Sequence, residues 1–354
     1  MSRLHTIDLH YLGIPQAIAA FVMMGSDGPV LIETGPASTL NNLADGLASL
    51  NLGLADIRHA LVTHIHLDHA GAAGHLARNG TRIYVHEFGA KHLIDPSRLI
   101  ESATRIYADQ MDRLWGSIVP VPEKLVTPVH DGDVIAIGDL RFTALETPGH
   151  ARHHHAFAVD LVPPLPLGEG SEVRAERATG TQPGGATEPR TPSPRPSPRG
   201  RGSRRICFAG DAAGIIIPGI PEPPAGKFIA VPTPPPEFDP PAWKASIDRL
   251  SAMNFDAIHL THFGVRRNVA EHLARLRELV DQHVDFVQHA MERREPREEM
   301  LARYIAWNRN AANSEGLSDE DAAKYVSANL LTMNVDGMIR WWSKNHHASA
   351  APGA

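Results

Sequence analysis

The chain has 354 residues, of which 42% are hydrophobic, so it can bury one large core or a core with an appended unit. Its 40 acidic and 34 basic residues give a net charge of −6, which disfavours the basic surface that nucleic-acid binding requires. No run of about 18 apolar residues could span a bilayer, and Cys207, the only cysteine, cannot form an intrachain disulfide. We therefore expect a cytoplasmic globular protein without membrane or nucleic-acid partners.

The N-terminal part of the chain predicts strands first and then alternating helices and strands. Apolar and β-branched runs predict strands over 5–12, 17–24 and 29–35, with a Ser-Asp-Gly turn before the third. The pattern then predicts, in order, a helix near 40–50, a strand over 59–64, a helix over about 70–78, a strand over 82–86 and a mainly helical stretch over 87–115.

The second half predicts antiparallel strands followed by helices. Residues 131–160 alternate in polarity and contain two Gly-Asp-type turns, which is typical of antiparallel strands. Further strands are expected over 205–211 and 256–260, and a proline-rich loop over 218–241 could shape a substrate pocket or serve as a plain surface connector. From about residue 268 the pattern is helical to the end.

Residues 162–205 interrupt this order. They contain 9 prolines, 7 glycines, 8 arginines, 4 glutamates and no aromatic residue. Such a segment cannot bury enough apolar surface to offset its ordering entropy, so we predict a disordered insertion in a strand-to-strand turn. Its arginines could contact nucleic acid or acidic lipid, but a solvated insertion explains the same composition.

Four potential metal ligands follow the strand at 59–64 within six residues: His64, His66, Asp68 and His69. An apolar run leads into them and a run of small residues leads out, which predicts a strand, a tight loop and the start of a helix. Imidazole and carboxylate are the ligands that zinc and similar divalent ions take in proteins. A purely structural cluster would have to find hydrogen-bond partners for four polar groups at a buried strand end, so we interpret the cluster as a metal site.

Three more motifs extend this pattern: Thr-Pro-Gly-His ending at His150, Phe-Ala-Gly-Asp ending at Asp211, and Thr-His-Phe-Gly containing His262. Together the motifs resemble the metallo-β-lactamase-fold hydrolase superfamily, over roughly residues 5–265. The resemblance implies an α/β (α+β) fold, a four-layer αββα sandwich with the metal site at one edge between the sheets, and a C-terminal helical extension. We predict a domain over 1–267, with the insertion at 162–205, and a helical region over 268–345.

The resemblance also implies a ligand set for two metal ions. His64, His66 and His150 bind the first ion, Asp68, His69 and His262 bind the second, and Asp211 bridges the two. Zinc is the expected metal, with iron and manganese as alternatives. Two divalent ions can hold a hydroxide, polarise a carbonyl and stabilise an oxyanion, and Asp68 is the expected catalytic residue, which orients the hydroxide or takes up its proton.

Other polar residues near these motifs have weaker signals. Glu33 is expected either as a partner of a ligand or turn organiser, or in a plain surface role, and Thr63 and Thr261 are expected to hydrogen-bond neighbouring groups. Any of His153, His154 and His155 could contact substrate or metal, although strand alternation should point some of them outward. We expect His75 and His86 to be structural, and Cys207 to be a buried small hydrophobe.

The site supports several chemistries, and the fold does not choose among them. The expected reaction is hydrolysis of a small carbonyl substrate, most simply a thioester or ester, because the C-terminal helices resemble those of the glyoxalase II (hydroxyacylglutathione hydrolase) group. A lactonase, a β-lactamase, a mononuclear-iron persulfide dioxygenase and a non-catalytic regulatory protein remain alternatives. The expected partner is a small-molecule substrate, and a homodimer remains open.

Overall fold

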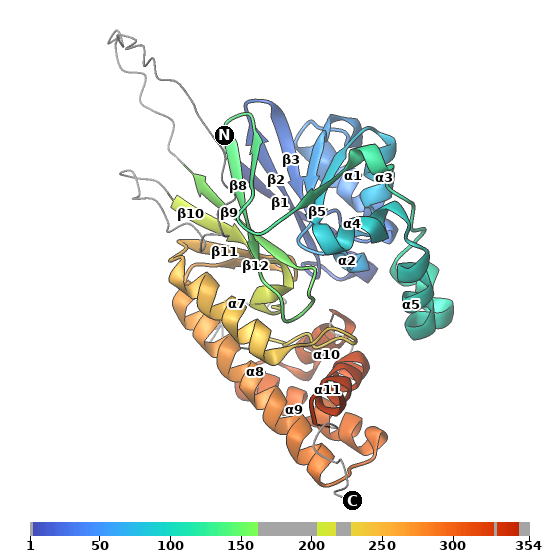
Figure 1. Ribbon diagram of the computed structural model, residues 1–354, viewed down its shortest axis with the longest axis vertical. Coiled ribbons are helices and arrows are strands. Elements are labelled where there is room, and N and C mark those ends of the chain that lie inside the picture. Colours follow the sequence, from blue (N-terminus) through green and yellow to red (C-terminus); the bar gives the residue numbers. More distant parts are fainter. Residues whose placement is uncertain (1–2, 162–203, 217–227, 329–330, 347–354) are drawn as a thin grey trace, which may run out of the picture.

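The computed structural model describes residues 3–161, 204–216, 228–328 and 331–346. Two six-stranded sheets pack face to face, helices cover their outer faces, and further helices extend below the second sheet in the orientation of Figure 1. The α/β (α+β) fold and the four-layer αββα arrangement with a C-terminal helical extension are therefore confirmed. No helix in the described part of the chain has the length and apolar run needed to cross a membrane.

The first sheet is mixed, and its parallel part ends where the histidine-rich loop begins. Its order is β1-β2-β3-β4-β5-β6, with β1 to β3 antiparallel and β3 to β6 parallel. Ile32 pairs with Leu61, and Leu61 pairs with Tyr84, so the carboxyl ends of three strands meet at one edge. The strands are β1 (Leu4–Asp8), β2 (Ala19–Gly25), β3 (Gly28–Ile32), β4 (His59–Leu61), β5 (Arg82–His86) and β6 (Val126–Val129).

The second sheet is antiparallel except for one pair. Its order is β12-β11-β10-β9-β8-β7, and only β10 and β11 run parallel. That parallel pair brings the carboxyl ends of β10 and β11 to the edge where the first sheet ends. The strands are β7 (Val134–Ile137), β8 (Leu140–Glu146), β9 (His155–Leu161), β10 (Arg204–Phe208), β11 (Ala257–Leu260) and β12 (Gly264–Arg266).

Helices cover the outer face of each sheet. Those on the first sheet are α1 (Leu40–Ser49), α2 (Leu67–Ala70), α3 (Ala73–Arg78), α4 (Glu87–Ile94), α5 (Ser97–Tyr107) and α6 (Met111–Leu114). On the second sheet lie α7 (Pro240–Ala252) and α8 (Val269–Glu292), and α9 (Arg297–Ser314), α10 (Asp319–Ala328) and α11 (Leu331–His346) continue from them. Short 3-10 helices occur at η1 (Tyr11–Gly13), η2 (Ala37–Thr39), η3 (Leu54–Asp56), η4 (Ala108–Gln110), η5 (Glu123–Leu125) and η6 (Gly210–Ala213).

Three apolar clusters correspond to the three interfaces between layers. One lies between the sheets and contains Phe21, Phe142 and Phe208, and a second joins the first sheet to its helices. The third joins the second sheet to α7, α8, α9 and α11. Since α8 shares this last cluster with the sheet, the division of the chain at residues 267 and 268 stays a prediction.

Some elements were not predicted, and their composition explains why. Strand β6 contains Pro128, which cannot donate to a ladder, but β6 is an edge strand where that donor is not needed. Strand β12 has only three residues, too few for an alternating pattern. The first predicted strand ends early because His10 and Leu12 adopt positive φ angles of 44° and 55°, which turn the chain into η1.

The predicted insertion ends two residues too late. Residues 162–203 lie outside the described part of the chain, but Arg204 and Arg205 belong to β10 and pair with Leu161 and Asp160 of β9. Arg205 is buried, and its Nε and Nη2 donate to the two carboxylate oxygens of Asp160 over 2.8 and 3.0 Å. A basic residue within a low-complexity run can therefore belong to a sheet when a carboxylate on the neighbouring strand forms an ion pair with it.

We predict that residues 162–203 can be replaced by a short Asn-Gly turn between Leu161 and Arg204. The hairpin of β9 and β10 pairs over five residues whatever joins it, and loop closure costs only about 0.6 kcal/mol per doubling of loop length. Thermal unfolding and metal content should stay as in the full chain, or stability should rise slightly. As a contrast, a deletion that also removes Arg204 and Arg205 should lower the melting temperature. Loss of bound metal on replacing 162–203 alone would refute the prediction.

Candidate metal centre

The first group of predicted ligands is placed by the end of β4. The chain leaves the sheet at Leu61 and turns through residues 62–66 into α2, whose first turn carries Asp68 and His69. The N–H of His69 donates to the carbonyl of His66 over 3.0 Å, which closes this turn and puts all four ligands on one side of the strand end. The short helix thus explains why four ligands occur within six residues.

The remaining predicted ligands come from the second sheet. His150 lies in the loop between β8 and β9, Asp211 in η6 after β10, and His262 two residues beyond the end of β11. Gly149 has a φ of 136°, and a Cβ there would overlap Trp243 of α7, so only glycine lets this loop lie against the helix. That close approach holds His150 at the edge between the sheets.

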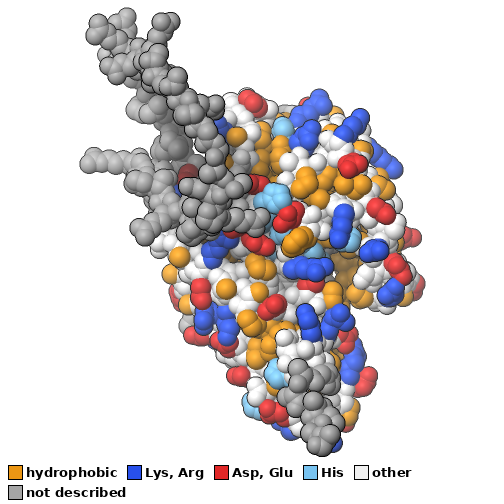
Figure 2. Space-filling view, viewed as in Figure 1, with side chains coloured by type: hydrophobic (Ala, Val, Ile, Leu, Met, Phe, Trp, Pro, Cys, Tyr) orange, Lys and Arg blue, Asp and Glu red, His pale blue; other side chains and the backbone are white. Residues whose placement is uncertain are grey.

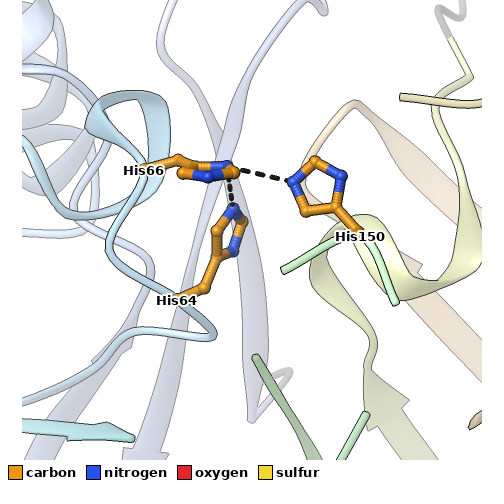
Figure 3. A group of neighbouring side chains, drawn as sticks. All are labelled: His64, His66 and His150. Atoms are coloured by element: carbon orange, nitrogen blue, oxygen red, sulfur yellow. Dashed lines mark hydrogen bonds between the residues drawn. The ribbon is translucent and has the colours of Figure 1, made fainter. Parts of the chain in front are cut away.

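His64, His66 and His150 converge on one point (Figure 3). His66 Nδ1 lies 2.9 Å from His64 Nε2 and 3.0 Å from His150 Nε2, and the rings of His64 and His66, from one loop, point toward the ring of His150 from another segment. Nitrogen ligands of a tetrahedral zinc ion lie about 3.3 Å apart when each bond is about 2.0 Å. The observed separations are within a few tenths of an ångström of that value.

Asp68, His69 and His262 form a second group beside the first. His262 Nε2 lies 3.1 Å from Asp68 Oδ2, and His69 Nε2 lies 3.7 Å from the same oxygen. Asp211 stands between the groups, with Oδ2 at 3.4 Å from His150 Nε2 and Oδ1 at 3.3 Å from His69 Nε2. All seven predicted ligands are therefore brought together, and a third group of His64, His69 and Asp211 overlaps the other two.

The donor atoms of this cluster fit metal ions better than they fit one another. His69 Nε2 and Asp211 Oδ1 are buried and, although 3.3 Å apart, form no hydrogen bond with each other or with another described group, a condition that normally destabilises a folded chain. The nitrogens of His64, His66 and His150 face one another, and shared protons cannot satisfy all of them. Divalent cations would pair these lone pairs, so the residues present are suited to hold metal ions.

The pKa shifts of the cluster divide it into two halves. Burial, reinforced by neighbouring imidazoles, holds the pKa of His64 well below its usual range and lowers that of His66 to about 3. Burial would also lower the pKa of His69, but the carboxylates of Asp211, Asp68 and Glu33 raise it well above its usual range. Neutral imidazoles in the first half are ready to bind metal, and the second half has the excess negative charge that attracts a cation.

Backbone and hydroxyl groups orient the imidazoles. Nδ1 of His150 lies 3.0 Å from the carbonyl of Pro232, and Nδ1 of His262 lies 3.2 Å from that of Ala17. Because a carbonyl only accepts, each Nδ1 carries the proton and each Nε2 turns a lone pair to the site. His64 Nδ1 makes the equivalent contact with the Thr63 hydroxyl at 3.0 Å, whereas His66 faces the cluster with Nδ1.

Glu33 is buried and accepts hydrogen bonds from several segments of the chain, rather than lying at the surface. Its Oε1 accepts hydrogen bonds from the hydroxyls of Thr63 over 2.6 Å and Thr261 over 3.1 Å, and lies 3.1 Å from His69 Nδ1. Its Oε2 accepts the N–H of Thr63 over 3.3 Å. Glu33 adopts a φ of 64°, so its backbone turns sharply after β3 and directs the side chain beneath the cluster. The roles predicted for Thr63 and Thr261 are thereby confirmed.

The three consecutive histidines are all buried, so the expectation that some point outward is wrong. Strand β9 begins only at His155, and strand alternation therefore does not apply to the two residues before it. His154 Nε2 accepts the N–H of Asp211 over 3.2 Å, His153 lies 3.2 Å from Glu237, and His155 stacks on His86 with centroids 4.3 Å apart. None of them belongs to the two ligand groups.

Other residues occupy the structural places that were expected. His86 Nδ1 accepts the N–H of Phe88 at the start of α4, and His75 Nε2 lies 2.7 Å from the carbonyl of Ser117. Cys207 is fully buried in β10, and burial raises the pKa of its thiol. A thiol in that position does not act as a nucleophile at neutral pH.

A chain of buried hydrogen bonds links the C-terminal helices to His150, and no pattern in the sequence indicated it. Asn334 of α11 accepts the N–H of Thr233 over 2.9 Å and lies 3.3 Å from the hydroxyl of Tyr304, which in turn lies 3.0 Å from His283 Nε2. Thr233 directly follows Pro232, whose carbonyl holds His150. The helical extension is thus connected to the metal cluster through one loop.

The cluster lies at the base of a cavity of about 330 Å³. Its walls come from α4, α5, α6, the segment around residues 232–237 and α11. The interpretation of the proline-rich stretch as a pocket wall is confirmed for its described part, where Pro232, Pro234, Pro235 and Pro236 line the cavity. The volume is in the range of sites for small organic ligands.

Comparison with known proteins agrees with the ligand motifs and the sandwich. Residues 13–161 carry the sequence pattern of the metallo-β-lactamase superfamily. Among curated proteins, a metallo-beta-lactamase fold-containing protein of Sulfurisphaera tokodaii is 27% identical over 161 residues, and a hydroxyacylglutathione hydrolase of Vibrio cholerae is 30% identical over 114 residues. These matches cover 44% and 32% of this chain, and 59% and 34% of the respective relatives.

Solved structures show the same metallo-β-lactamase fold. A metallo-beta-lactamase family protein from Thermus thermophilus has a TM-score of 0.57 at 17% identity, over 98% of this chain and 94% of that one. A subclass B3 metallo-beta-lactamase of Bradyrhizobium japonicum has a TM-score of 0.53 at 17% identity, over 82% and 94% of the two chains. At these identities the likeness concerns the fold alone, and for the Thermus protein it extends over the C-terminal helices.

Replacing Glu33 with Gln should weaken both the fold and the metal site. The new amide would set an NH₂ group against the N–H of Thr63 and would remove the charge beside His69. We expect a loss of about 1–3 kcal/mol in the free energy of unfolding and about 10- to 100-fold weaker metal binding. Chemical denaturation and chelator competition measure the two effects, with exposed Glu123→Gln as the control. Unchanged metal affinity would show that Glu33 does not hold His69.

Replacing Asn334 with Ala should act on His150 from a distance. The substitution leaves the buried N–H of Thr233 without its acceptor, and we expect about 1–3 kcal/mol of destabilisation. Loosening the 231–233 segment should also weaken binding of the first metal ion by about 10-fold, with less effect on the second. Stepwise chelator titration distinguishes the two ions, and the substitution Asn313→Ala at an exposed position of α9 is the control. An equal loss of affinity for both ions would contradict the connection through Pro232.

Proposed function

We propose that the protein is a dinuclear metal-dependent hydrolase of a small carbonyl substrate, most simply a thioester or ester. The observation that supports this proposal above all is the position of Asp211, whose two carboxylate oxygens face the two ligand groups separately. When bound, two divalent cations would supply a water of lowered pKa and an electrophile for the carbonyl oxygen. Zinc fits the nitrogen and oxygen donors, and iron or manganese could take the same ligands.

The residues of the chain have distinct tasks in this proposal. His64, His66 and His150 would hold the first cation, Asp68, His69 and His262 the second, and Asp211 both. Asp68 is the one carboxylate among these ligands that lines the cavity while remaining partly exposed, so it can accept a proton from a nucleophile on the substrate side. Hydrogen bonds from Thr63 and Thr261 to Glu33 keep the ligands in place, so little reorganisation is needed when substrate binds.

The choice of a thioester or ester draws on two likenesses. The hydroxyacylglutathione hydrolase of Vibrio cholerae matches part of the chain. Helices follow the sandwich, which is what the resemblance to the group of that enzyme implies. Lactone and β-lactam hydrolysis use the same site chemistry and belong in the same substrate panel. A mononuclear-iron dioxygenase would contain one iron ion per chain and take up oxygen, which separates it from the hydrolase by metal analysis. The cytoplasmic location and the absence of nucleic-acid and membrane partners stay predictions.

The test combines metal analysis with a panel of thioesters, esters, lactones and β-lactams. We expect two metal ions per chain and hydrolysis that stops when a chelator removes them. Asp211→Ala should reduce the occupancy of both ions and lower turnover by more than about 100-fold, because it removes a ligand from each group. Exposed Asp45→Ala is the matched control. If Asp211→Ala kept two ions and full turnover, the dinuclear assignment would be wrong.

Asp68→Ala separates the two groups in the same experiment. His64, His66 and His150 remain in this variant, so the first ion should be retained when the second is lost. Elemental analysis after dialysis against a weak chelator gives the count. Equal loss of both ions would contradict the division of the ligands.

A further inference from the structure

The cavity above the metal cluster has two walls of different character. Its base contains His66, Asp68, His150, Asp211 and His262, so whatever fills it meets the ligand groups. The surface around the cavity combines hydrophobic, basic and histidine side chains, and Figure 2 shows these kinds together on the face between the upper and lower parts of the molecule. The distribution of these side chains around the base indicates the kind of substrate that fits.

One wall is aromatic and aliphatic. Tyr11 stacks on Trp115 at 5.8 Å with an interplanar angle of 18°, and Tyr107 meets the same indole edge-on at 5.1 Å. Leu99, Ile106 and Leu114 continue this wall. Aromatic rings that pack against one another in this way form a rigid apolar surface, which keeps its shape when no ligand fills the cavity.

Two exposed hydrophobic side chains lie at this cavity. Among the described residues, the large hydrophobic residues that are strongly exposed are Phe88, Ile106, Val134 and Ile305, and the first two line the cavity at 50% and 42% exposure. Exposed hydrophobic side chains at the rim of a pocket are typical of a surface that an apolar ligand covers.

The other wall is basic. Arg98 and Arg152 line it with His92, against the single carboxylate of Glu237. Arg152 Nε lies 2.8 Å from Glu237 Oε1, and Glu237 Oε2 also lies 3.2 Å from His153, so this carboxylate is already engaged. Arg98 is exposed and has no ion pair among the described residues, which leaves a positive charge facing the cavity.

The apolar and the basic residues meet on α5, where Arg98 directly precedes Leu99, and Ile106 and Tyr107 follow on the same helix. Tyr11, Tyr107 and Asp68 line the same cavity. On the basic side, His153 packs against His66 at 5.5 Å and contacts Glu237. A substrate with its carbonyl at the cluster would therefore be within reach of both an apolar and a cationic surface of the same cavity.

We propose that the cavity selects an amphipathic substrate, which carries an apolar chain and an anionic group in addition to a hydrolysable carbonyl. The chain lies against Tyr11, Tyr107 and Trp115, and the anionic group lies at Arg98. This inference rests on the proposed function for the identity of the reacting bond, but the binding of such a molecule does not depend on its hydrolysis. A short, uncharged ester would leave both walls unused.

The apolar wall predicts a dependence on chain length. Burial of each added methylene stabilises a complex by up to about fourfold in its association constant, until the cavity is full. An anion at a partly exposed arginine adds about fivefold. Both effects should appear in kcat/KM when the substrate is varied one part at a time.

The kinetic test uses the full chain loaded with zinc and two matched series of thioesters. One series joins acetyl to octanoyl groups to 3-mercaptopropionate or to neutral 2-mercaptoethanol, and the other joins succinyl or neutral acyl groups to ethanethiol and octanethiol. In at least one series kcat/KM should rise at least about 10-fold with chain length, and the anionic member should exceed the neutral one by about fivefold. Independence of both chain length and charge in both series would overturn the proposal.

Two variants assign these effects to the two walls. Arg98→Ala should abolish the preference for the anion and keep the dependence on chain length, whereas Ser102→Trp, on α5 at the cavity, should reduce the dependence on chain length. Matched controls lie on the same helix away from the cavity: Arg105→Ala, whose side chain pairs with Glu101, and exposed Thr104→Trp. Equal effects of the variants and their controls would contradict the assignment.

A binding measurement separates this inference from the proposed function. Calorimetry with octyl sulfonate should show binding that Arg98→Ala weakens and Ser102→Trp abolishes, and octyltrimethylammonium should bind less tightly. If these results hold but no member of either series is hydrolysed, the cavity assignment stands and the proposed hydrolase activity fails. If thioesters are hydrolysed but octyl sulfonate does not bind, the hydrolase activity stands and the cavity assignment fails.

Discussion

The geometry of the metal cluster depends on one buried carboxylate. Glu33 follows β3, Thr63 follows β4, and Thr261 follows β11, so its hydrogen bonds join strand ends of both sheets below His69. A charge buried away from water is costly unless it is fully hydrogen-bonded, and this one is. Apolar contacts alone would tolerate a slight separation of the two sheets. Such a separation would leave this carboxylate without its hydrogen-bond donors.

The remaining ligands are held by weaker and more local means. Backbone carbonyls hold His150 and His262, and the small residue Gly210 lets η6 approach Thr63 and His154 closely enough to place Asp211. One of these carbonyls belongs to a loop that α11 anchors through Asn334. The sandwich thus supplies the strand ends, while the helical extension supplies part of the support for a single ligand.

The sequence predicted most of the sandwich and all seven members of the cluster, because both leave local patterns. Strand ends, turn glycines and closely spaced histidines are visible in a single chain, and the order of four motifs identified the superfamily. The hydrogen-bond chain through Asn334, Tyr304 and His283 left no such pattern, since its members lie far apart in sequence and look like ordinary helix residues. The same holds for β6 and β12, whose pairing depends on neighbours rather than on their own composition, and for Arg205, whose buried place depends on Asp160.

The hairpin of β9 and β10 has a consequence for how the protein tolerates additions. Phe157 and Phe208 pair near the end of the hairpin that leads to the metal cluster. Leu161 and Arg204 pair at the other end of the hairpin, which points away from the C-terminal helices in Figure 1. Chain that enters between Leu161 and Arg204 therefore leaves the sandwich at the end remote from the cavity. This junction is a natural attachment point, where a binding module or a reporter domain could be carried without standing in the path of substrate.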